Sequence, residues 1–144
     1  MTSEFAIAVH ALVFLNHKAA TLSSEALAEN VCTNPARIRK VMAKLKAAGL
    51  VKTREGAEGG YRFALDPAAV TLRQVDEAVG GKLVSAAWRS GNRELDCLIA
   101  SGMADIMEGI YAELDALCRQ RLEQITLADI DRQIFGLKTP RQKE

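Results

Sequence analysis

The sequence predicts a mainly α-helical fold with one small β-hairpin and a long helix towards the C-terminus. Apolar residues recur at helical spacing over most of the chain. Two short alternating runs flank a glycine-rich segment at residues 55–60, which is typical of a hairpin. An amphipathic pattern then continues from residue 98 for roughly 25 residues. The chain has 144 residues, enough for one domain with a helical appendage and a buried core.

The composition is that of an ordinary globular protein, with 49% hydrophobic and 26% charged residues. No apolar run approaches the ~20 residues of a membrane span, and the first residues lack the features of a signal peptide. We therefore expect a cytoplasmic protein without a membrane partner. Neither the three cysteines nor the two histidines form a cluster of metal-ligand or catalytic spacing, so we expect no metal site, no catalytic residues and no enzyme activity.

Three helices open the chain. The first is predicted over residues 2–17 from the spacing of its apolar side chains. The second begins at Ser23-Ser24, where a hydroxyl can cap it, and continues to about residue 30. The third covers residues 36–48, after a capping asparagine at 34 and a proline. Two short helices joined by a tight turn, the second strongly basic, are typical of a helix-turn-helix that reads DNA.

A β-hairpin follows the third helix. Its strands are predicted over residues 50–54 and 61–65, and the loop between them carries Gly56, Gly59 and Gly60. Glycine permits positive φ and a close approach of the backbone to a partner. The loop leads into a strand rather than a helix, so it lacks the context of a phosphate-binding loop. We interpret this hairpin as the wing of a winged helix-turn-helix.

The C-terminal half is predicted to connect the first domain to a dimer interface. A helix capped by Thr71 ends at Gly80-Gly81, and a long helix begins near residue 98. Its apolar stripe can cover a second copy of the chain or pack against the chain's own first helix, and both can hold. The residues of this stripe are Met103, Met107, Ile110, Leu114 and Leu117.

Four segments follow from this pattern. They are a winged helix-turn-helix DNA-binding domain at 1–80, a connecting and candidate sensing loop at 81–97, dimerisation helices at 98–136 and a flexible tail at 137–144.

Charge is unevenly distributed along a chain whose net charge is only +1. Between residues 37 and 62 there are eight Lys or Arg against two Glu, and between 94 and 131 nine Asp or Glu against two Arg. A local basic stretch favours contact with a polyanion. Solvated helix faces would give the same pattern, and charge alone does not separate the two interpretations.

The order of these elements resembles the Rrf-two family of winged-helix transcription regulators, which includes the IscR, NsrR and CymR types. The resemblance covers roughly residues 1–80, and residues 98–135 match only in pattern, as the family's long dimerisation helix. It is strongest to the cluster-free, YwnA-like branch. The motifs that carry it are Leu27-Ala28, Asn34-Pro35, the run 45–51, the run 59–65, Asp66-Pro67 and Thr71-Leu72.

Better-known relatives in this family hold an iron–sulfur cluster on three closely spaced cysteines between the wing and the dimer helix. In this chain the same region supplies Cys97 alone. One thiolate cannot hold a cluster that takes about four ligands. We therefore expect no cofactor.

The resemblance implies a homodimeric repressor that binds a roughly palindromic operator in double-stranded DNA. Arg37, Arg39 and Lys40 are the candidates for reading guanine in the major groove. Relatives often carry a basic residue just before the first glycine of the wing, where this chain has Glu55, so the wing's contribution stays open. The residues expected to contact DNA are Thr33, Asn34, Arg37, Arg39, Lys40, Lys44, Arg54 and Arg62.

The sequence leaves the regulatory signal open. Cys32, just before a helix N-terminus, and Cys97 are candidate thiol sensors; Cys32 can instead be a small apolar residue that fills the turn, which we favour, and Cys97 can be a buried residue. A small-molecule effector between Trp88 and the long helix is the other option. The alternative function is a winged-helix module that regulates a protein partner without DNA. The basic bias of the third helix and wing argues against it, because protein interfaces are depleted in lysine.

Overall fold

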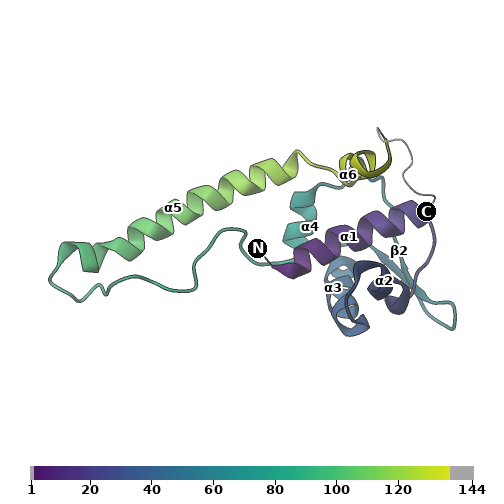
Figure 1. Ribbon diagram of the computed structural model, residues 1–144, viewed down its shortest axis with the longest axis horizontal. Helices are drawn as coiled ribbons and strands as arrows, with labels where there is room; N and C mark the ends of the chain where they lie inside the picture. Colours follow the sequence, from purple (N-terminus) through teal and green to yellow (C-terminus); the bar gives the residue numbers. More distant parts are fainter. Residues whose placement is uncertain (1, 137–144) are drawn as a thin grey trace.

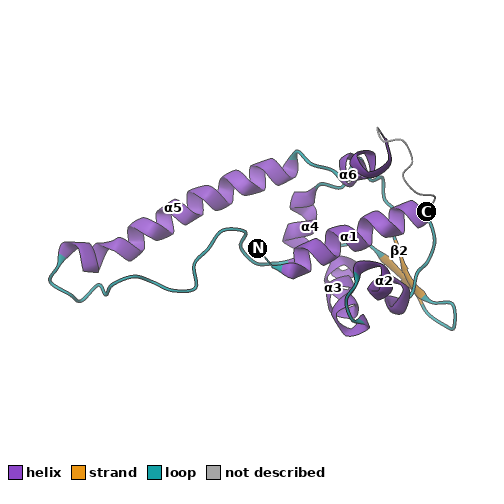
Figure 2. Cartoon of the chain, in the orientation of Figure 1, coloured by secondary structure: helices purple, strands orange, loops and turns teal. Residues whose placement is uncertain are grey.

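Helix α1 (Ser3–Lys18) lies at the centre of the N-terminal part of the chain, and later helices pack around it (Figure 1). The computed structural model describes residues 2–136. Figure 2 shows helices and one two-stranded hairpin, the fold class that the sequence predicts. The elements after α1 are α2 (Ser24–Val31), α3 (Pro35–Ala47), β1 (Lys52–Arg54), β2 (Gly60–Arg62), α4 (Leu72–Val79), α5 (Leu98–Glu123), α6 (Leu127–Asp131) and the π-helix η1 (Arg132–Gly136).

Side-chain caps fix where the helices begin. The N–H of Ala26 donates to the hydroxyl of Ser23 at 3.1 Å, and the N–H of Arg37 donates to the side-chain oxygen of Asn34 at 2.9 Å. Thr71 caps α4 in the same way. Each cap satisfies a backbone donor that the first turn of a helix leaves free, so the helix starts predicted from these residues are confirmed.

The hydrophobic core is built around α1. Ala8 and Ala11 are fully buried, and their small side chains let neighbouring helices approach the α1 backbone closely. The core residues come from α1 to α4 and from α6, so these elements form one folded unit. The largest fully buried side chains are Leu12, Leu15, Leu27, Ile38, Val41, Met42, Leu45, Val75 and Leu127.

The hairpin packs beside this core. Thr53 lies opposite Tyr61 in the antiparallel pair, and Tyr61 also exchanges backbone hydrogen bonds of 2.8 and 2.9 Å with Leu22. The strands are shorter than the predicted runs. Their outer ends, which include Val51 and Phe63, leave the ladder and are buried in the core.

Helix α6 returns to the N-terminal part of the chain. The N–H of Leu72 donates to the carbonyl of Ile125 at 2.8 Å, and the N–H of Leu127 donates to the carbonyl of Val70 at 3.0 Å. The side chain of Leu127 is buried in the core. Residues 98–136, predicted as dimerisation helices, are therefore divided between α5, which projects, and α6 with η1, which lie against the N-terminal helices (Figure 1).

The projecting part consists of α5 and residues 80–97, which run beside it without helix or strand (Figure 1). We call this part the arm, and the rest of the described chain the body. None of the helices formed by the described residues is both long and apolar enough to cross a membrane. The predicted tail at 137–144 lies outside the described residues.

Replacing Leu12 with alanine should lower the free energy of unfolding by about 2–5 kcal/mol, because it removes a fully buried side chain from the centre of the core. Urea denaturation followed by circular dichroism measures this loss. Leu65→Ala is the control, since Leu65 is 43% exposed and should cost less than about 1 kcal/mol. Equal losses in the two variants would contradict the assignment of α1 as the core helix.

Candidate nucleic-acid interface

Helix α3 presents one outer face. Its inner residues, from Ile38 to Leu45 at helical spacing, are buried against α1 and its neighbours. The outermost line on the opposite face is formed by Ala36, Lys40, Ala43 and Ala47, all exposed. Three of these four are alanines, so a partner can approach the helix backbone closely around Lys40.

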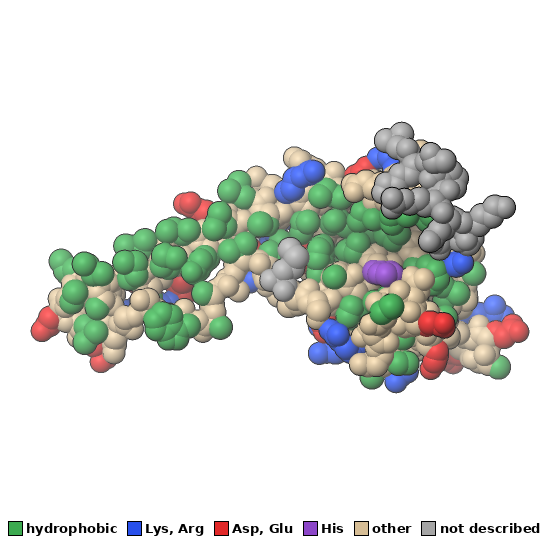
Figure 3. All heavy atoms as spheres, viewed as in Figure 1, with side chains coloured by type: hydrophobic (Ala, Val, Ile, Leu, Met, Phe, Trp, Pro, Cys, Tyr) green, Lys and Arg blue, Asp and Glu red, His purple; other side chains and the backbone are tan. Residues whose placement is uncertain are grey.

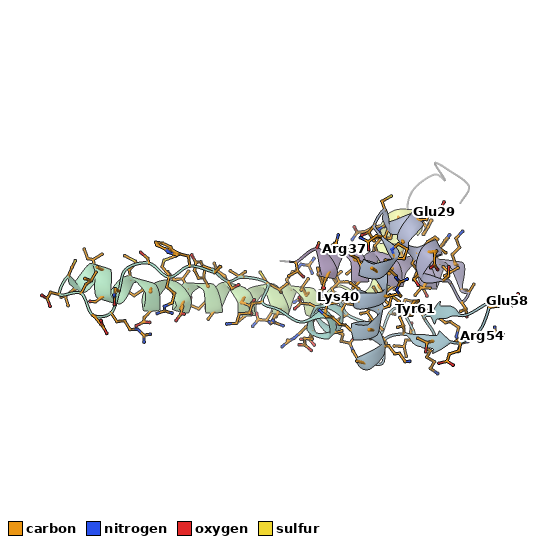
Figure 4. All side chains as sticks on the ribbon, turned by 90° about the horizontal axis from the view of Figure 1, so that it is seen from below. Glu29, Arg37, Lys40, Arg54, Glu58 and Tyr61 are labelled. Atoms are coloured by element: carbon orange, nitrogen blue, oxygen red, sulfur yellow. The ribbon has the colours of Figure 1, made fainter. Side chains whose placement is uncertain are left out.

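Basic side chains flank this line. Arg39 lies on the side of α2, with its guanidinium 4.0 Å from the carboxylate of Glu25, and both side chains are largely exposed. Arg37 lies on the side of α1 and donates to the hydroxyl of Ser3 at 2.5 Å. Such contacts at the surface are weak, so a phosphate could displace them. The view from below in Figure 4 shows Arg37 and Lys40 on α3.

Lys44 has a different position from the other predicted DNA contacts. Its ammonium is 2.6 Å from the carboxylate of Glu4 and donates to the carbonyl of Val79 at 3.2 Å. Lys40 pairs with the same carboxylate at 3.3 Å but keeps 69% of its side chain exposed, against 37% for Lys44. Lys44 therefore joins α1, α3 and α4 within the chain and contributes positive charge from the flank of the candidate interface.

The turn before α3 brings Thr33 and Asn34 to the same end of the helix. The side-chain oxygen of Asn34 caps α3, which leaves its amide NH₂ able to donate outward. Thr33 is half-buried, and its N–H donates to the carbonyl of Ala28 at 3.0 Å. Cys32 ends α2 with φ of +64° and an exposed side chain.

The hairpin adds a second basic surface. Lys52 lies directly opposite Arg62 in the ladder, and Arg54 is two residues further along the same face. All three are exposed. Like charges that face each other across a ladder repel, and an anionic partner would relieve this repulsion. Lys52 was missed in the sequence analysis, although its place opposite Arg62 follows once the strand register is known.

The wing glycines have identifiable backbone roles. Gly56 has φ of +103° and Gly60 has φ of +154°, and a side chain at Gly60 would overlap the carbonyl of Leu22. A side chain at Gly59 would overlap the carbonyl of Arg54. Glycine is therefore required here by the turn itself and by close approach within the chain.

Figure 3 shows the distribution of charge and apolar surface on one face of the molecule. Lys and Arg side chains lie along the lower edge of the body, with acidic side chains among them, while apolar side chains cover much of the arm. We define the candidate interface as the outer face of α3 with the basic face of the hairpin.

The arm carries one apolar stripe along α5. Met103 and Met107 are half-buried and line a cavity of about 720 Å³ together with Trp88 and Tyr111 of the same chain. The connecting loop thus reaches one edge of the predicted stripe at these two methionines. The large apolar side chains that stay exposed along α5 include Ile99, Ile106, Ile110, Leu114 and Leu117.

The cysteines lie in three separate places. Cys97 precedes α5 and is exposed, and the N–H groups of Ala100 and Ile99 lower the pKa of its thiol. Cys118 is half-buried on α5. Within residues 2–136, no group of three or more His, Cys, Asp or Glu side chains is placed to hold a metal ion.

A winged helix-turn-helix followed by a long projecting helix is typical of a class of transcription regulators, and comparisons with known proteins agree. The sequence matches the Rrf2 family, described as an iron-dependent transcriptional regulator, over residues 1–133. The chain belongs to the Rrf2, or Rrf-two, family of DNA-binding transcription regulators, as the sequence motifs indicate.

Individual relatives support this assignment. YwnA of Bacillus subtilis, named as an HTH-type transcriptional regulator, is 26% identical over 135 residues, which cover 94% of this chain and 99% of YwnA. A solved structure named as a transcriptional regulator from Lactobacillus plantarum is 26% identical, with a TM-score of 0.80 over 90% of this chain and 88% of the other. IscR from T. potens is 19% identical and shares the fold, with a TM-score of 0.71 over 99% of this chain and 93% of its own.

The family description names iron, and the region just before α5 supplies one thiolate, Cys97. An iron–sulfur cluster takes about four ligands, so this thiolate alone does not make up a ligand set.

The ion pairs of Glu4 should make stability depend on pH. Hydrogen bonds from Lys44, and more weakly from Lys40, hold the pKa of Glu4 below its ordinary value of 4.5. The ionised form is therefore favoured by folding, and this stabilisation is present at neutral pH and lost as the pH falls through the folded-state pKa.

Glu4→Gln should lower the free energy of unfolding by about 1 kcal/mol at pH 7. The expected loss is this small because Lys44 is partly exposed and water screens the ion pair. The difference from the unmodified protein should close as the pH falls below 4.5, which urea titrations between pH 7 and pH 3 measure. Glu25→Gln, at a largely exposed pair, is the control and should change the free energy of unfolding by less than about 0.5 kcal/mol at pH 7. A difference that grows towards acid would contradict the argument.

Proposed function

We propose that the chain is a homodimeric repressor that places α3 in the major groove of operator DNA and the hairpin beside it. The observation that carries this proposal is the outer face of α3, where Lys40 stands among alanines and is flanked by Arg37 and Arg39. The alanines allow the helix to enter the groove deeply, and an alanine methyl can contact the methyl group of thymine. Arg and Lys supply bidentate contacts to guanine.

Other basic residues position the protein on the duplex. Arg54, Arg62 and Lys52 of the hairpin are suited to phosphate contacts, as is the free amide of Asn34 at the N-terminus of α3. Thr33 adds a hydroxyl at the same end. Lys46, exposed on the same flank of α3 as Arg39, extends this set. Phosphate contacts of this kind give affinity that falls steeply with salt concentration.

The second copy is proposed to pack on the exposed apolar face of α5. A helix of 26 residues is roughly 39 Å long, and its uncovered stripe includes Ile106, Ile110 and Leu117. A second α5 across a two-fold axis offers a stripe of equal length and the same chemistry. Such a dimer presents two α3 helices, which implies a roughly palindromic operator. A dimer bound to this operator would block the access of other proteins to the DNA and so repress transcription.

We further propose that the signal acts on the arm without an iron–sulfur cluster. Cys97 is favoured over Cys32 as a thiol sensor because backbone donors stabilise its thiolate. The cavity beside Trp88 offers a second route, for a small apolar effector.

Lys40→Ala should weaken operator binding by about 1–3 kcal/mol and lower the salt dependence, because Lys40 is the central charge of the α3 face. Fluorescence anisotropy on DNA from upstream of the gene, at low and moderate salt, measures both effects. Arg132→Ala is the matched control, since Arg132 lies in η1 on the other side of α1 from α3 (Figure 1). Absence of binding by the folded, unmodified protein would favour the protein-interaction module instead.

Ile110→Glu should convert the dimer to a monomer, because it places a charge in the centre of the proposed apolar seam. Light scattering after size exclusion gives the mass directly. Ala116→Glu adds the same charge to an exposed position off the stripe and should leave the dimer intact. A dimer that survives Ile110→Glu would exclude this face as the interface.

A further inference from the structure

The last turn of α4 is held from two sides by charged residues. On one side Lys44 of α3 donates to the carbonyl of Val79 while pairing with Glu4. On the other side Arg119 of α5 reaches the carboxylate of Asp76 at 3.2 Å. α4 thus stands between the helix proposed to read DNA and the arm, and it contacts both through polar side chains.

Arg119 joins three segments at this point. Besides Asp76, its guanidinium donates to the carbonyl of Gly81 at 3.2 Å and to the carboxylate of Asp115 at 3.0 Å. The other oxygen of Asp115 accepts from the N–H groups of Leu83 and Val84 at 2.8 and 2.9 Å. We call Asp76, Asp115 and Arg119 the junction cluster. It binds the end of α4, the start of the connecting loop and α5 to one another.

Burying the carboxylate of the junction cluster costs free energy. Asp76 is only 3% exposed, and it is the one buried charged residue among those the structure describes. Burial raises the pKa of Asp76, and the charge of Arg119 opposes that rise. Asp115 has its pKa lowered, first by the N–H of Val84 and then by Arg119. A buried carboxylate is tolerated only with a partner, so the contact between α4 and α5 is strongly specified.

The chain at the junction needs such a restraint. Gly80 and Gly81 both have left-handed φ, of +80° and +91°, and no atom lies within 4 Å of the position a side chain would take. The glycines themselves therefore do not fix the direction in which the chain leaves the body. Further ties between arm and body lie at the C-terminal end of α5, where Arg73 of α4 pairs with Glu123 at 2.6 Å and Thr71 pairs through its backbone with Thr126 just beyond the helix. Arg119 adds a restraint one turn before Glu123, and together these contacts set the direction of α5.

We infer that Arg119 is a positioning residue for operator recognition: it fixes the angle between arm and body, and thereby the spacing of the two α3 helices in the dimer. This inference rests on the proposed function. From Arg119 to Gly102 the helix is roughly 25 Å long, so a 10° swing displaces Gly102 by about 4 Å. The rise of one base pair is about 3.4 Å, so loss of this restraint blurs discrimination between half-site spacings.

The test measures the angle within one chain. Spin labels at Ala47→Cys and Gly102→Cys, with the natural cysteines replaced by serine and the labelled chains diluted in unlabelled protein, report the distance from α3 to the arm. The parent protein should give one narrow distribution. Arg119→Met should broaden or shift it by several ångströms, and Arg121→Met should not, because Arg121 donates to Gln124 in its own turn and is no member of the junction cluster. An unchanged distribution in folded Arg119→Met would overturn the inference.

Two further experiments distinguish a variant that fails to fold from a failure of the inference itself. If Arg119→Met does not fold, the double variant Asp76→Asn, Arg119→Met removes the uncompensated buried charge and carries the same expectation. Duplexes with half-sites one or two base pairs closer or further apart should then differ tenfold or more in affinity for the parent protein, and less than threefold for the variant. Equal spacing selectivity in both would also overturn the inference. A parent protein that binds no DNA would contradict the proposed function alone, because the distance is measured without DNA.

Discussion

The structure depends on the close packing of α1 against its neighbours. Ala8 and Ala11 lie fully buried at the centre of this helix, and Leu12 and Leu15 fill the space on either side. Because α1 touches α2, α3, α4 and α6, it fixes where each of them lies. The face of α3 proposed to read DNA is thus exposed because its other face is committed to α1. Burial of the apolar residues of α3 orients the helix, and this places its basic residues on the outer side.

Polar contacts within the chain then determine which basic residues remain available to an anionic partner. Glu4 engages Lys44 closely and Lys40 more loosely, so two lysines one turn apart have different roles. A buried carboxylate at Asp76 similarly commits Arg119 to the junction with the arm. In both cases an acidic residue distant in sequence holds a basic side chain in a contact within the chain. The cations on the outer edge of α3 and on the hairpin keep exposed side chains, even where they pair loosely with Glu4 or Glu25.

Local signals in the sequence predicted the helices, the hairpin and the family, because caps, glycines and apolar spacing act over a few residues. Asn34 capped α3 and Thr71 capped α4 as expected. The role of Lys44 could not be predicted, because it depends on Glu4, forty residues away. Asp76 did leave a signal, since it stands among the buried residues of α4 at helical spacing, and a carboxylate there requires a partner. The half-burial of Met103 and Met107 depends on the connecting loop, whose path follows no periodic pattern in the sequence. The contacts with DNA and with a second copy remain predictions.

The return of α6 to the body has a topological consequence. Leu127 completes a core whose other members all come before residue 80, and Ile125 pairs with the strand-like segment before α4. The body is therefore a discontinuous domain, formed by the residues before 80 and by the residues after α5. The arm is an insertion between these two stretches of chain. Both ends of an insertion can stay fixed while its length and its surface change. The body, which is proposed to read DNA, and the arm can thus diverge separately, as long as the distance between the two ends of the arm is kept.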